Sequence, residues 1–277
     1  MKKINVALIR GAFAHSCELQ NYAALPKKYD LTCITSQNPL QENLPLRNIR
    51  LTSLTDLPIP HKLLKPIANR TIGDMHVLFQ LENELRNYDI IHTADPYYYY
   101  SYQAALVKNQ YPKKKLISTY WETKPHHNET VDKKRKLKQF VMGSVDHYIV
   151  HTEKSRSALV SEGITHDKIA LIRLGVDLDR FKPVAKQEDI LLFVGRLVPE
   201  KNPIAVLSSF IELKREFPTY KLHFFGEGPL KSILQKRVYE LGLTNSVLFF
   251  THAYENIHKA YQKASICMFP TQSNSTW

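Results

Sequence analysis

Short apolar runs alternate with longer amphipathic stretches along the 277-residue chain. The runs have the length of buried strands, whereas the stretches between them repeat apolar residues every three or four positions, as helices with one buried face do. In the first part of the chain the runs predict strands at Ile4–Ile9, Leu31–Thr35, Ile90–His92, Leu116–Thr119, His147–Val150 and Ile169–Arg173. The stretches predict helices at Glu18–Leu25, Ile67–Arg86, Tyr97–Lys108, Asp132–Met142 and Lys154–Glu162. This alternation predicts a parallel sheet covered by helices on both faces.

The alternation is interrupted at residues 178–189, where the chain is polar, contains Pro183 and shows neither period. It then restarts, with strands expected at Ile190–Val194, Leu222–Phe225, Val247–Phe250 and Ile266–Phe269 and helices at Asn202–Phe217, Leu230–Leu241 and about Asn256–Lys263. We therefore expect two Rossmann-like, doubly wound α/β domains, residues 1–177 and 190–277, joined by a linker at 178–189. The second domain looks incomplete, because it holds about four strands and stops at Trp277, directly after a strand end.

The composition is that of a globular protein, with 43% apolar and 23% charged residues. The N-terminal apolar run, Ile4–Ile9, is too short for a signal peptide or a membrane span, and no later stretch approaches 18 consecutive apolar residues. A cytoplasmic protein is therefore expected. The three cysteines, Cys17, Cys33 and Cys267, lie far apart in the sequence, so neither a disulfide nor a metal site is expected.

The net charge of +12 is concentrated in residues 1–184, which hold 27 Lys and Arg against 18 Asp and Glu. A dense basic run comprises Lys133, Lys134, Arg135, Lys136 and Lys138. Such an excess is typical of proteins with an anionic partner, namely nucleic acid, membrane lipid or a phosphorylated substrate, but a solvated helix face is an equal alternative. No nucleic-acid-binding motif accompanies the charge, so nucleic acid is not an expected partner. Peripheral contact with an anionic membrane remains an alternative.

The segment FVGRLVPEKN, Phe193 to Asn202, holds the residues of an anion site. A buried strand would deliver Gly195 at its carboxyl end, where the missing Cβ lets a ligand approach the backbone. Arg196 offers a planar fork for phosphate oxygens, and Lys201 lies beside an expected helix start, whose free N–H groups favour anions. Together they predict a diphosphate site. From spacing alone, Arg196 and Lys201 are equally well explained as surface charges, one of them paired with Glu200.

A second glycine segment, FFGEGP, runs from Phe224 to Pro229. A strand followed by Gly226, Glu227, Gly228 and a helix start predicts a tight turn that brings the backbone close to a ligand. The segment lacks the full pattern of a dinucleotide fingerprint or a P-loop, so a simple strand-to-helix turn is an equal alternative.

The order of these two segments resembles glycosyltransferase family 4, which consists of retaining enzymes with the two-domain GT-B fold. Three stretches of the first domain add to the resemblance, namely DIIHTADP at Asp89–Pro96, LISTYWETKP at Leu116–Pro125 and VDHYIVHTEKSRSAL at Val145–Leu159. The stretch LIRLGVDLDRFKP, Leu171 to Pro183, closely matches the hinge of the family. The resemblance covers essentially the whole chain.

The resemblance implies an enzyme that moves a sugar from a nucleotide-diphosphate-sugar donor to a glycan or lipid-linked acceptor, with retention and with no metal or other cofactor. Arg196 and Lys201 would neutralise the diphosphate leaving group. The other donor-side residues that it implies are Gly11, Gly195, Gly226, Glu227, Gly228 and Thr251. Thr251 would begin a loop, ending at Tyr254, that lies against the nucleotide base. The first domain would hold the acceptor, and closure of the domains would exclude water.

The chain departs from the family on the acceptor side. A Gly-Gly-x-Glu loop commonly follows the first strand, and only Glu18 of that pattern is present here. Trp121 stands where many members carry a His near the sugar. Glu122, Asp95 and His92 are therefore the catalytic candidates, although each is equally well explained as a structural hydrogen-bonding residue. Weaker candidates are His126, His127 and His151.

A further departure concerns a pair of glutamates that contacts the donor in the family. The pair follows a segment that matches Phe269-Pro270-Thr271, and the sequence ends before reaching it. The resemblance therefore implies a fragment or a truncated gene, with weak donor binding and possible inactivity as written. The alternatives to a transferase are a sugar-nucleotide epimerase of the same architecture and a basic protein that binds nucleic acid or membrane.

Overall fold

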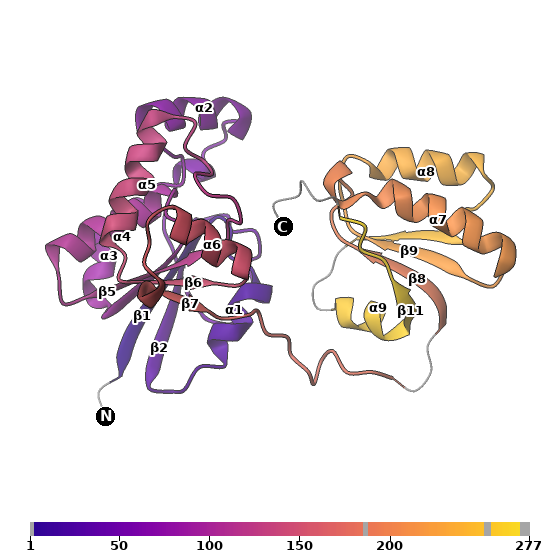
Figure 1. The fold of residues 1–277 in the computed structure, drawn as a ribbon, viewed down its shortest axis with the longest axis horizontal. Helices are drawn as coiled ribbons and strands as arrows, with labels where there is room; N and C mark the ends of the chain where they lie inside the picture. Colours follow the sequence, from indigo (N-terminus) through magenta and orange to yellow (C-terminus); the bar gives the residue numbers. More distant parts are fainter. Residues whose placement is uncertain (1–2, 185–187, 252–255, 272–277) are drawn as a thin grey trace. The chain divides into compact units, whose positions relative to one another are not determined.

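A computed structural model describes residues 3–184, 188–251 and 256–271 of the chain. The chain divides into two compact units, Met1–Gly175 and Val176–Trp277. Each unit holds one parallel β-sheet covered by helices (Figure 1). The predicted α/β architecture with two doubly wound sheets is therefore confirmed. None of the helices in the described residues has the length and apolar character needed to cross a membrane.

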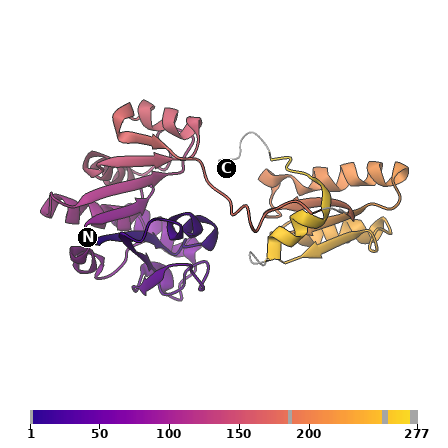
Figure 2. The same cartoon turned by 90° about the horizontal axis from the view of Figure 1, so that it is seen from below.

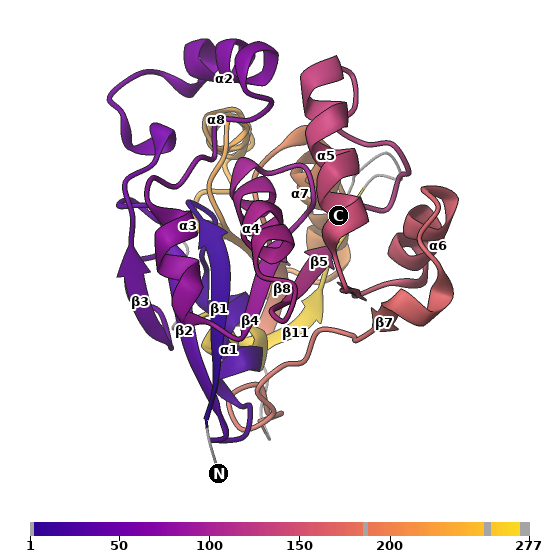
Figure 3. The ribbon, with the colours of Figure 1, turned by 90° about the vertical axis from the view of Figure 1, so that its left-hand side faces the viewer.

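Unit 1 is built on a seven-stranded parallel sheet in the order β3-β2-β1-β4-β5-β6-β7, which Figure 3 shows fanning out from β3 to β7. Its strands are β1 (Ile4–Gly11), β2 (Tyr29–Thr35), β3 (Arg47–Arg50), β4 (Ile90–Ala94), β5 (Lys115–Tyr120), β6 (His147–Val150) and β7 (Ile169–Leu171). Its α-helices are α1 (Ser16–Ala23), α2 (His61–Thr71), α3 (Leu81–Glu84), α4 (Tyr99–Gln110), α5 (Asp132–Ser144) and α6 (Glu153–Ser161). Short 3-10 turns lie at Leu54–Asp56, Leu85–Asn87 and His166–Lys168.

The core of unit 1 lies on both faces of this sheet. Ala7 and Ile9 of β1 pack into a large cluster with α3, α4, α5 and α6, whereas Val6 and Leu8 pack into a smaller one with Leu19 of α1. Successive side chains of a strand point to opposite faces, so a strand that is covered on both faces must be apolar throughout. This is why the central strands are uninterrupted apolar runs in the sequence.

The strand order places a change of direction between β1 and β4, because the chain winds outward from β1 to β3 and then returns to add β4 on the other side. In open α/β sheets a crevice forms outside the carboxyl ends of the strands at such a point. Gly11 and Asp95 stand at these two strand ends and therefore border the crevice of unit 1.

One sequence prediction in unit 1 is wrong, and one strand was not predicted. The expected single helix at Ile67–Arg86 is instead α2, which starts earlier and ends at Thr71, and the short α3. The chain turns at Gly73, whose φ of +104° lies in the region that favours glycine and whose added Cβ would meet Leu137 at 3.1 Å. The edge strand β3 was not predicted, because its residues are half-buried or exposed and form no apolar run.

Unit 2 holds a four-stranded parallel sheet in the order β10-β9-β8-β11. Its elements are β8 (Glu188–Val194), a 3-10 turn (Pro199–Lys201), α7 (Pro203–Glu216), β9 (Lys221–Phe225), α8 (Lys231–Glu240), β10 (Val247–Phe250), α9 (Ile257–Lys263) and β11 (Ala264–Cys267). Helices α7 and α8 cover one face and α9 the other (Figures 1 and 2). Asn202 is the N-cap residue of α7 and Pro203 its first residue, as their order in the sequence predicts.

Candidate active site

The two glycine segments of unit 2 lie side by side at one edge of its sheet. Gly195 follows β8 and Gly226 follows β9, and these neighbouring strands are parallel, so their carboxyl ends meet at the same edge. The backbone N–H of Gly195 donates to Phe225 O at 3.0 Å, and that of Leu197 donates to Glu227 O at 2.8 Å. The backbone hydrogen bonds thus continue past the ends of the strands and join the two loops.

The glycines of the second loop allow this close packing. A Cβ on Gly226 would lie 1.9 Å from Gly195 O, and one on Gly228 would lie 2.5 Å from Leu197 O. No side chain is compatible with such distances unless the backbone moves. Gly226 and Gly228 therefore have a packing role toward the first loop, which the sequence pattern did not reveal.

Both predicted phosphate-binding cations belong to the first loop. Arg196 is exposed and follows Gly195 directly, and Lys201 is half-buried at the end of the 3-10 turn before α7. Asn202 has a left-handed backbone with φ +51° and makes no side-chain capping hydrogen bond to α7. The N-terminal end of α7, with its partial positive charge, thus follows directly after Lys201, in the same loop as Arg196.

Glu227 and Thr251, two other predicted donor-side residues, are in contact. Glu227 Oε1 accepts from Lys231 Nζ at 2.6 Å and from Thr251 Oγ1 at 3.0 Å. Thr251 follows β10, whose last carbonyl, Phe250 O, accepts from the N–H of Gly226 at 3.0 Å. The remainder of the predicted base-contacting loop, residues 252–254, lies outside the described residues.

In unit 1, Gly11 ends β1 with φ +52° and lies against the ring of Tyr100, 3.3 Å from an added Cβ. The preceding residue, Arg10, is almost fully buried and donates from Nε to Glu18 Oε1 at 2.7 Å. The carboxylate of Glu18, the residue that the sequence shares with the family's loop pattern, is therefore paired with a buried arginine of the same unit. Glu18 and Tyr22 also line a cavity of about 380 Å³.

Asp95 and Glu122 are brought together by Tyr97. The Tyr97 hydroxyl lies 3.0 Å from Asp95 Oδ2 and 3.0 Å from Glu122 Oε1, and Trp121 N donates to Asp95 Oδ1 at 2.9 Å. The Tyr97 hydroxyl can donate its single proton to only one of the two carboxyl groups. A proton bound to the other carboxyl group could be donated to the Tyr97 oxygen, and both contacts would then be hydrogen bonds. Burial, followed by the nearby charge of Glu122, raises the pKa of Asp95 to about 7 despite the hydrogen bonds that favour its charged form. Asp95 also has φ +37°, a rare backbone conformation for a residue with a side chain.

His127 extends this cluster toward solvent. Its Nδ1 lies 2.6 Å from Glu122 Oε2, and 40% of its side chain is exposed while Glu122 is buried. Asp95, Tyr97, Glu122 and His127 thus form one hydrogen-bonded chain at the carboxyl ends of β4 and β5. Tyr97 was not predicted, because it belongs to a run of tyrosines, whereas His127 was predicted only as a weaker candidate.

The third candidate, His92, has a different environment. It is buried, and its Nε2 lies 2.8 Å from Thr119 Oγ1 while its ring meets Tyr22 edge-on. Burial, with a further contribution from Arg10, holds the pKa of His92 well below its usual value of 6.5, so the imidazole is neutral. These contacts give His92 a packing role between β4, β5 and α1.

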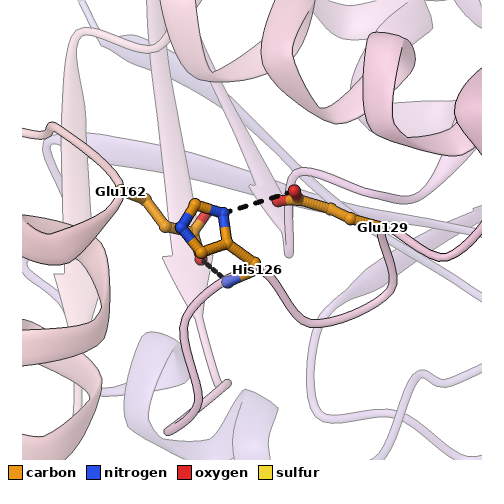
Figure 4. A group of neighbouring side chains, drawn as sticks. All are labelled: His126, Glu129 and Glu162. Carbon is orange, nitrogen blue, oxygen red and sulfur yellow. Dashed lines mark hydrogen bonds and ion pairs between the residues drawn. The ribbon is translucent and has the colours of Figure 1, made fainter.

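Three side chains of unit 1 have atoms close enough to hold a cation, namely those of His126, Glu129 and Glu162 (Figure 4). The buried ammonium group of Lys138 already supplies a positive charge to the two carboxylates, because its Nζ lies 2.7 Å from Glu129 Oε1 and 2.5 Å from Glu162 Oε2. Glu162 Oε1 accepts from Tyr120 Oη at 2.7 Å and from the N–H of His126 at 2.9 Å. This network fastens the loop that carries His126 and His127 to α5 and α6.

The predicted basic face of α5 is wrong at two of its positions. Lys138 is buried as described, and Lys134 is buried with Nζ 3.5 Å from Asp74 Oδ1. Lys133 and Lys136 remain exposed. The lysines of the basic run therefore lie on two faces of α5, one buried and one exposed, because residues three or four positions apart share a face of a helix and adjacent residues do not.

The family model for Glycosyltransferase Family 4 matches residues 15–180, and that for Glycosyl transferases group 1 matches residues 176–276. The D-inositol 3-phosphate glycosyltransferase of Nocardia farcinica is 28% identical over 155 residues, 49% of this chain and 34% of that protein. A Campylobacter jejuni GalNAc-alpha-(1->4)-GalNAc-alpha-(1->3)-diNAcBac-PP-undecaprenol alpha-1,4-N-acetyl-D-galactosaminyltransferase is 32% identical over 82 residues, 29% of this chain and 22% of that protein. The matches thus span about a third or less of the length of these relatives.

Solved structures share the fold at low identity. Anabaena HepE in complex with UDP and glucose matches with a TM-score of 0.70 and 12% identity, over 97% of this chain and 74% of that one. The UDP-GlcNAc 2-epimerase of Methanocaldococcus jannaschii matches with a TM-score of 0.59 and 12% identity, over 95% of this chain and 78% of that one. Since the family-4 model alone matches more than half of the residues, the chain belongs to glycosyltransferase family 4.

Proposed function

We propose that this chain belongs to a retaining glycosyltransferase that moves a sugar from a nucleotide-diphosphate-sugar donor to a glycan or lipid-linked acceptor. The observation that carries the proposal is the first glycine loop of unit 2. It carries Arg196 at its start and Lys201 directly before the N-terminal end of α7, and backbone hydrogen bonds join it to the second loop.

The chemistry of the donor explains why such a loop is useful. When the bond between sugar and diphosphate breaks, negative charge develops on the departing phosphate oxygens. Two fixed cations and the positive end of a helix stabilise that charge most when they are already in position, because no reorganisation is then needed. The guanidinium of Arg196 can donate two parallel hydrogen bonds to phosphate, and Lys201 supplies a point charge. The complex of HepE with UDP and glucose supports a uridine nucleotide as the first donor to test.

The acceptor is proposed to bind unit 1 at the carboxyl ends of β4 and β5. The chain of Asp95, Tyr97, Glu122 and His127 offers acceptors and donors suited to sugar hydroxyls, with the partly exposed His127 ring at its outer end. The Campylobacter relative, whose name includes an undecaprenol-linked sugar, supports a lipid-linked acceptor.

Nucleotide binding tests the donor site directly. Titration of the whole chain with UDP, followed by calorimetry, should show binding that Arg196→Ala or Lys201→Ala weakens by about 10- to 100-fold each, as expected for a hydrogen bond to a charged group. The matched control is Arg215→Ala, at the opposite end of α7, where the guanidinium pairs with Glu212 on the surface. Unchanged UDP affinity in both loop variants would refute the assignment of the phosphate site, and parallel titrations with GDP would identify the base.

A sugar-nucleotide epimerase is the second candidate, because the Methanocaldococcus jannaschii epimerase shares the fold. The two activities differ in their need for an acceptor. A transferase releases UDP from UDP-sugar only when an acceptor is added, whereas an epimerase converts the UDP-sugar without one. Chromatography of the nucleotide products with and without acceptor separates the two.

A further inference from the structure

Asp74 and His76 form a nearly buried pair in the segment that leads from α2 to α3. Their side chains are 2% and 9% exposed, and His76 Nδ1 lies 2.9 Å from Asp74 Oδ2. The same carboxylate accepts from the backbone N–H groups of His76 at 3.0 Å and Tyr99 at 3.1 Å, and Lys134 Nζ lies 3.5 Å from Asp74 Oδ1. Burial alone would raise the pKa of Asp74, but these contacts hold it below its usual value, so the carboxylate is ionised. Asp74 therefore accepts the Nδ1 proton of His76 and fixes the orientation of the ring.

The segment that carries this pair is fastened to α4. The N–H of Leu78 donates to Gln103 Oε1 at 3.0 Å, and Gln103 Nε2 donates to Leu78 O at 2.9 Å. The N–H of Tyr100 donates to His76 O at 3.1 Å. Since Nδ1 of His76 faces Asp74 and Nε2 has no hydrogen-bond partner among the described residues, Nε2 is the ring atom left for a ligand. A ring that is held in this way loses little freedom when a ligand binds it.

Two aromatic side chains pack against the imidazole of His76. The ring of Phe13, on the loop that follows β1, lies 4.9 Å from the His76 ring, and that of Tyr98 lies 5.0 Å from it, edge-on, centroid to centroid. Phe13 is nevertheless 45% exposed. A single exposed aromatic residue is common on proteins and needs no explanation. An exposed ring beside a fixed imidazole, however, offers a ligand an apolar face and a polar atom together.

These residues converge from three segments at the crevice of unit 1. Phe13 follows β1, Tyr98 follows β4, and His76 precedes α3. Strands β1 and β4 are the parallel neighbours between which the winding of the sheet changes direction, the place where open α/β sheets bind ligands. The Tyr98 ring also lies 4.7 Å from that of Tyr97, a member of the proposed acceptor site. The surface of Phe13 and His76 therefore adjoins that site.

The chemistry of this surface favours an uncharged ligand with an apolar and a polar side. Asp74 and Lys134, its charged members, neutralise each other, so neither a phosphate nor an amine is selected. A pyranose ring fits this description, because its C–H groups form an apolar face while its hydroxyls donate and accept hydrogen bonds. A nucleobase also stacks on aromatic side chains, but membership of a family that transfers sugars favours the pyranose.

We propose that Phe13 and His76 form a subsite for a pyranose ring of the acceptor glycan. The sugar stacks on Phe13, one of its hydroxyls donates to His76 Nε2, and Asp74 positions the imidazole. The choice of a sugar as the ligand rests on the proposed transferase function, but binding at this subsite requires none of the donor residues of unit 2. The subsite implies an acceptor that carries at least one sugar ring, and not a lipid phosphate alone.

Saturation-transfer NMR of the whole chain with the methyl glycosides of glucose, galactose and N-acetylgalactosamine tests the subsite. At least one glycoside should bind, and its ring protons should receive more saturation than its methyl group. Phe13→Ala should weaken binding by about 2- to 10-fold, as one aromatic contact predicts, whereas Phe13→Tyr should keep it. His76→Asn, which retains an N–H near Asp74 but lacks the atom equivalent to Nε2, should weaken it by about 2- to 10-fold. The longer side chain in His76→Gln should retain more of the affinity.

Nitrogen spectra of the chain labelled with ¹⁵N-histidine test the contact itself. The glycoside should shift the Nε2 signal of His76, identified by its absence in His76→Asn, and should leave that of the exposed His166 unchanged. Asp74→Asn should change the tautomer of the His76 ring, because the carboxylate that holds the Nδ1 proton is removed. An unchanged tautomer would refute the positioning role of Asp74.

Phe217→Ala is the matched control, because Phe217 is 50% exposed and belongs to unit 2. It should bind the glycoside like the unmodified chain. The proposal is overturned if none of the three glycosides binds, if Phe13→Ala or His76→Asn binds undiminished, or if Phe217→Ala loses as much affinity. Loss of UDP affinity in Phe13→Ala without loss of glycoside affinity would also overturn it, since the surface would then hold a nucleobase. Glycoside binding by a chain that does not bind UDP would support the subsite and refute only the phosphate assignment.

Discussion

Replacing Gly226 with alanine would place a methyl group 1.9 Å from the carbonyl oxygen of Gly195. Ordinary contacts of a Cβ begin near 3.4 Å, so one of the two loops would have to move by more than an ångström. The loops are joined on both sides of this point by the bonds from Gly195 N to Phe225 O and from Leu197 N to Glu227 O. The movement would therefore disrupt the loop that carries the proposed phosphate-binding cations.

The expected magnitude follows from these contacts. Each lost backbone hydrogen bond costs about 1 kcal/mol, and insertion of an extra methyl group into a packed region costs about 1–3 kcal/mol. The free energy of opening this part of unit 2 should thus fall by about 3–5 kcal/mol in Gly226→Ala. Gly242→Ala is the control in the same unit, because an added Cβ there meets nothing within 4 Å. Its φ of +66° should cost about 1 kcal/mol.

Hydrogen exchange followed by mass spectrometry measures this difference locally. Peptides that cover the two glycine loops should exchange about 30- to 900-fold faster in Gly226→Ala than in the control, since opening free energies determine exchange rates and the two variants differ by about 2–4 kcal/mol. The reasoning would be refuted if the loops of both variants exchanged equally while only Gly226→Ala lost UDP affinity. In that case the glycine would serve close approach of the ligand, as its sequence pattern alone predicts, and not the packing of the loops.

Three further predictions concern unit 1. Lys138→Met should lower the free energy of unfolding by about 3–5 kcal/mol, because it leaves the charges of Glu129 and Glu162 uncompensated. Lys136→Met removes an exposed ion pair with Asp132 and should change the free energy of unfolding by no more than about 0.5 kcal/mol. Urea denaturation of the two variants measures this difference. Asp95 has a pKa of about 7 in the fold and binds its proton more tightly than in the unfolded chain, so wild-type stability should fall by at most roughly 4 kcal/mol between about pH 4 and pH 7. Asp95→Asn removes that loss, so its stability relative to wild type should rise with pH, and parallel pH profiles would contradict the raised pKa. Tyr97→Phe should alter this pH profile while leaving UDP affinity unchanged, because the hydrogen bonds described for the Tyr97 hydroxyl join it to Asp95 and Glu122, which both belong to unit 1.

The sequence alone was sufficient for most of the architecture. Strands covered on both faces must be apolar throughout, and this requirement is local, so the runs that became β1, β4, β5 and β8 can be read directly from the chain. The N-cap at Asn202 is equally local. Edge strand β3 could not be predicted, because a half-exposed strand has no such requirement.

The candidate site was only partly predictable, because local patterns predict where strands end but not which side chains meet there. Asp95 and Glu122 follow strand ends in unit 1, and Gly195 and Arg196 follow a strand end in unit 2. The topology of a parallel sheet is enough to bring such positions to one edge within each unit. The partners of these residues depend on contacts between segments far apart in the chain. Tyr97 joins two carboxyl groups that are separated by 27 residues in the sequence.

The lysines of α5 and Gly226 show most clearly what the sequence alone does not predict. In the sequence Lys134 and Lys138 are indistinguishable from Lys133 and Lys136, and only the packing of α5 decides which of them are buried beside carboxylates. Gly226 likewise marks a turn in the sequence, whereas its contact with Gly195 O exists only once the two strands are paired. A local pattern reports which face of an element is buried, but the tertiary structure alone decides what each buried group meets, because that depends on atoms contributed by other segments.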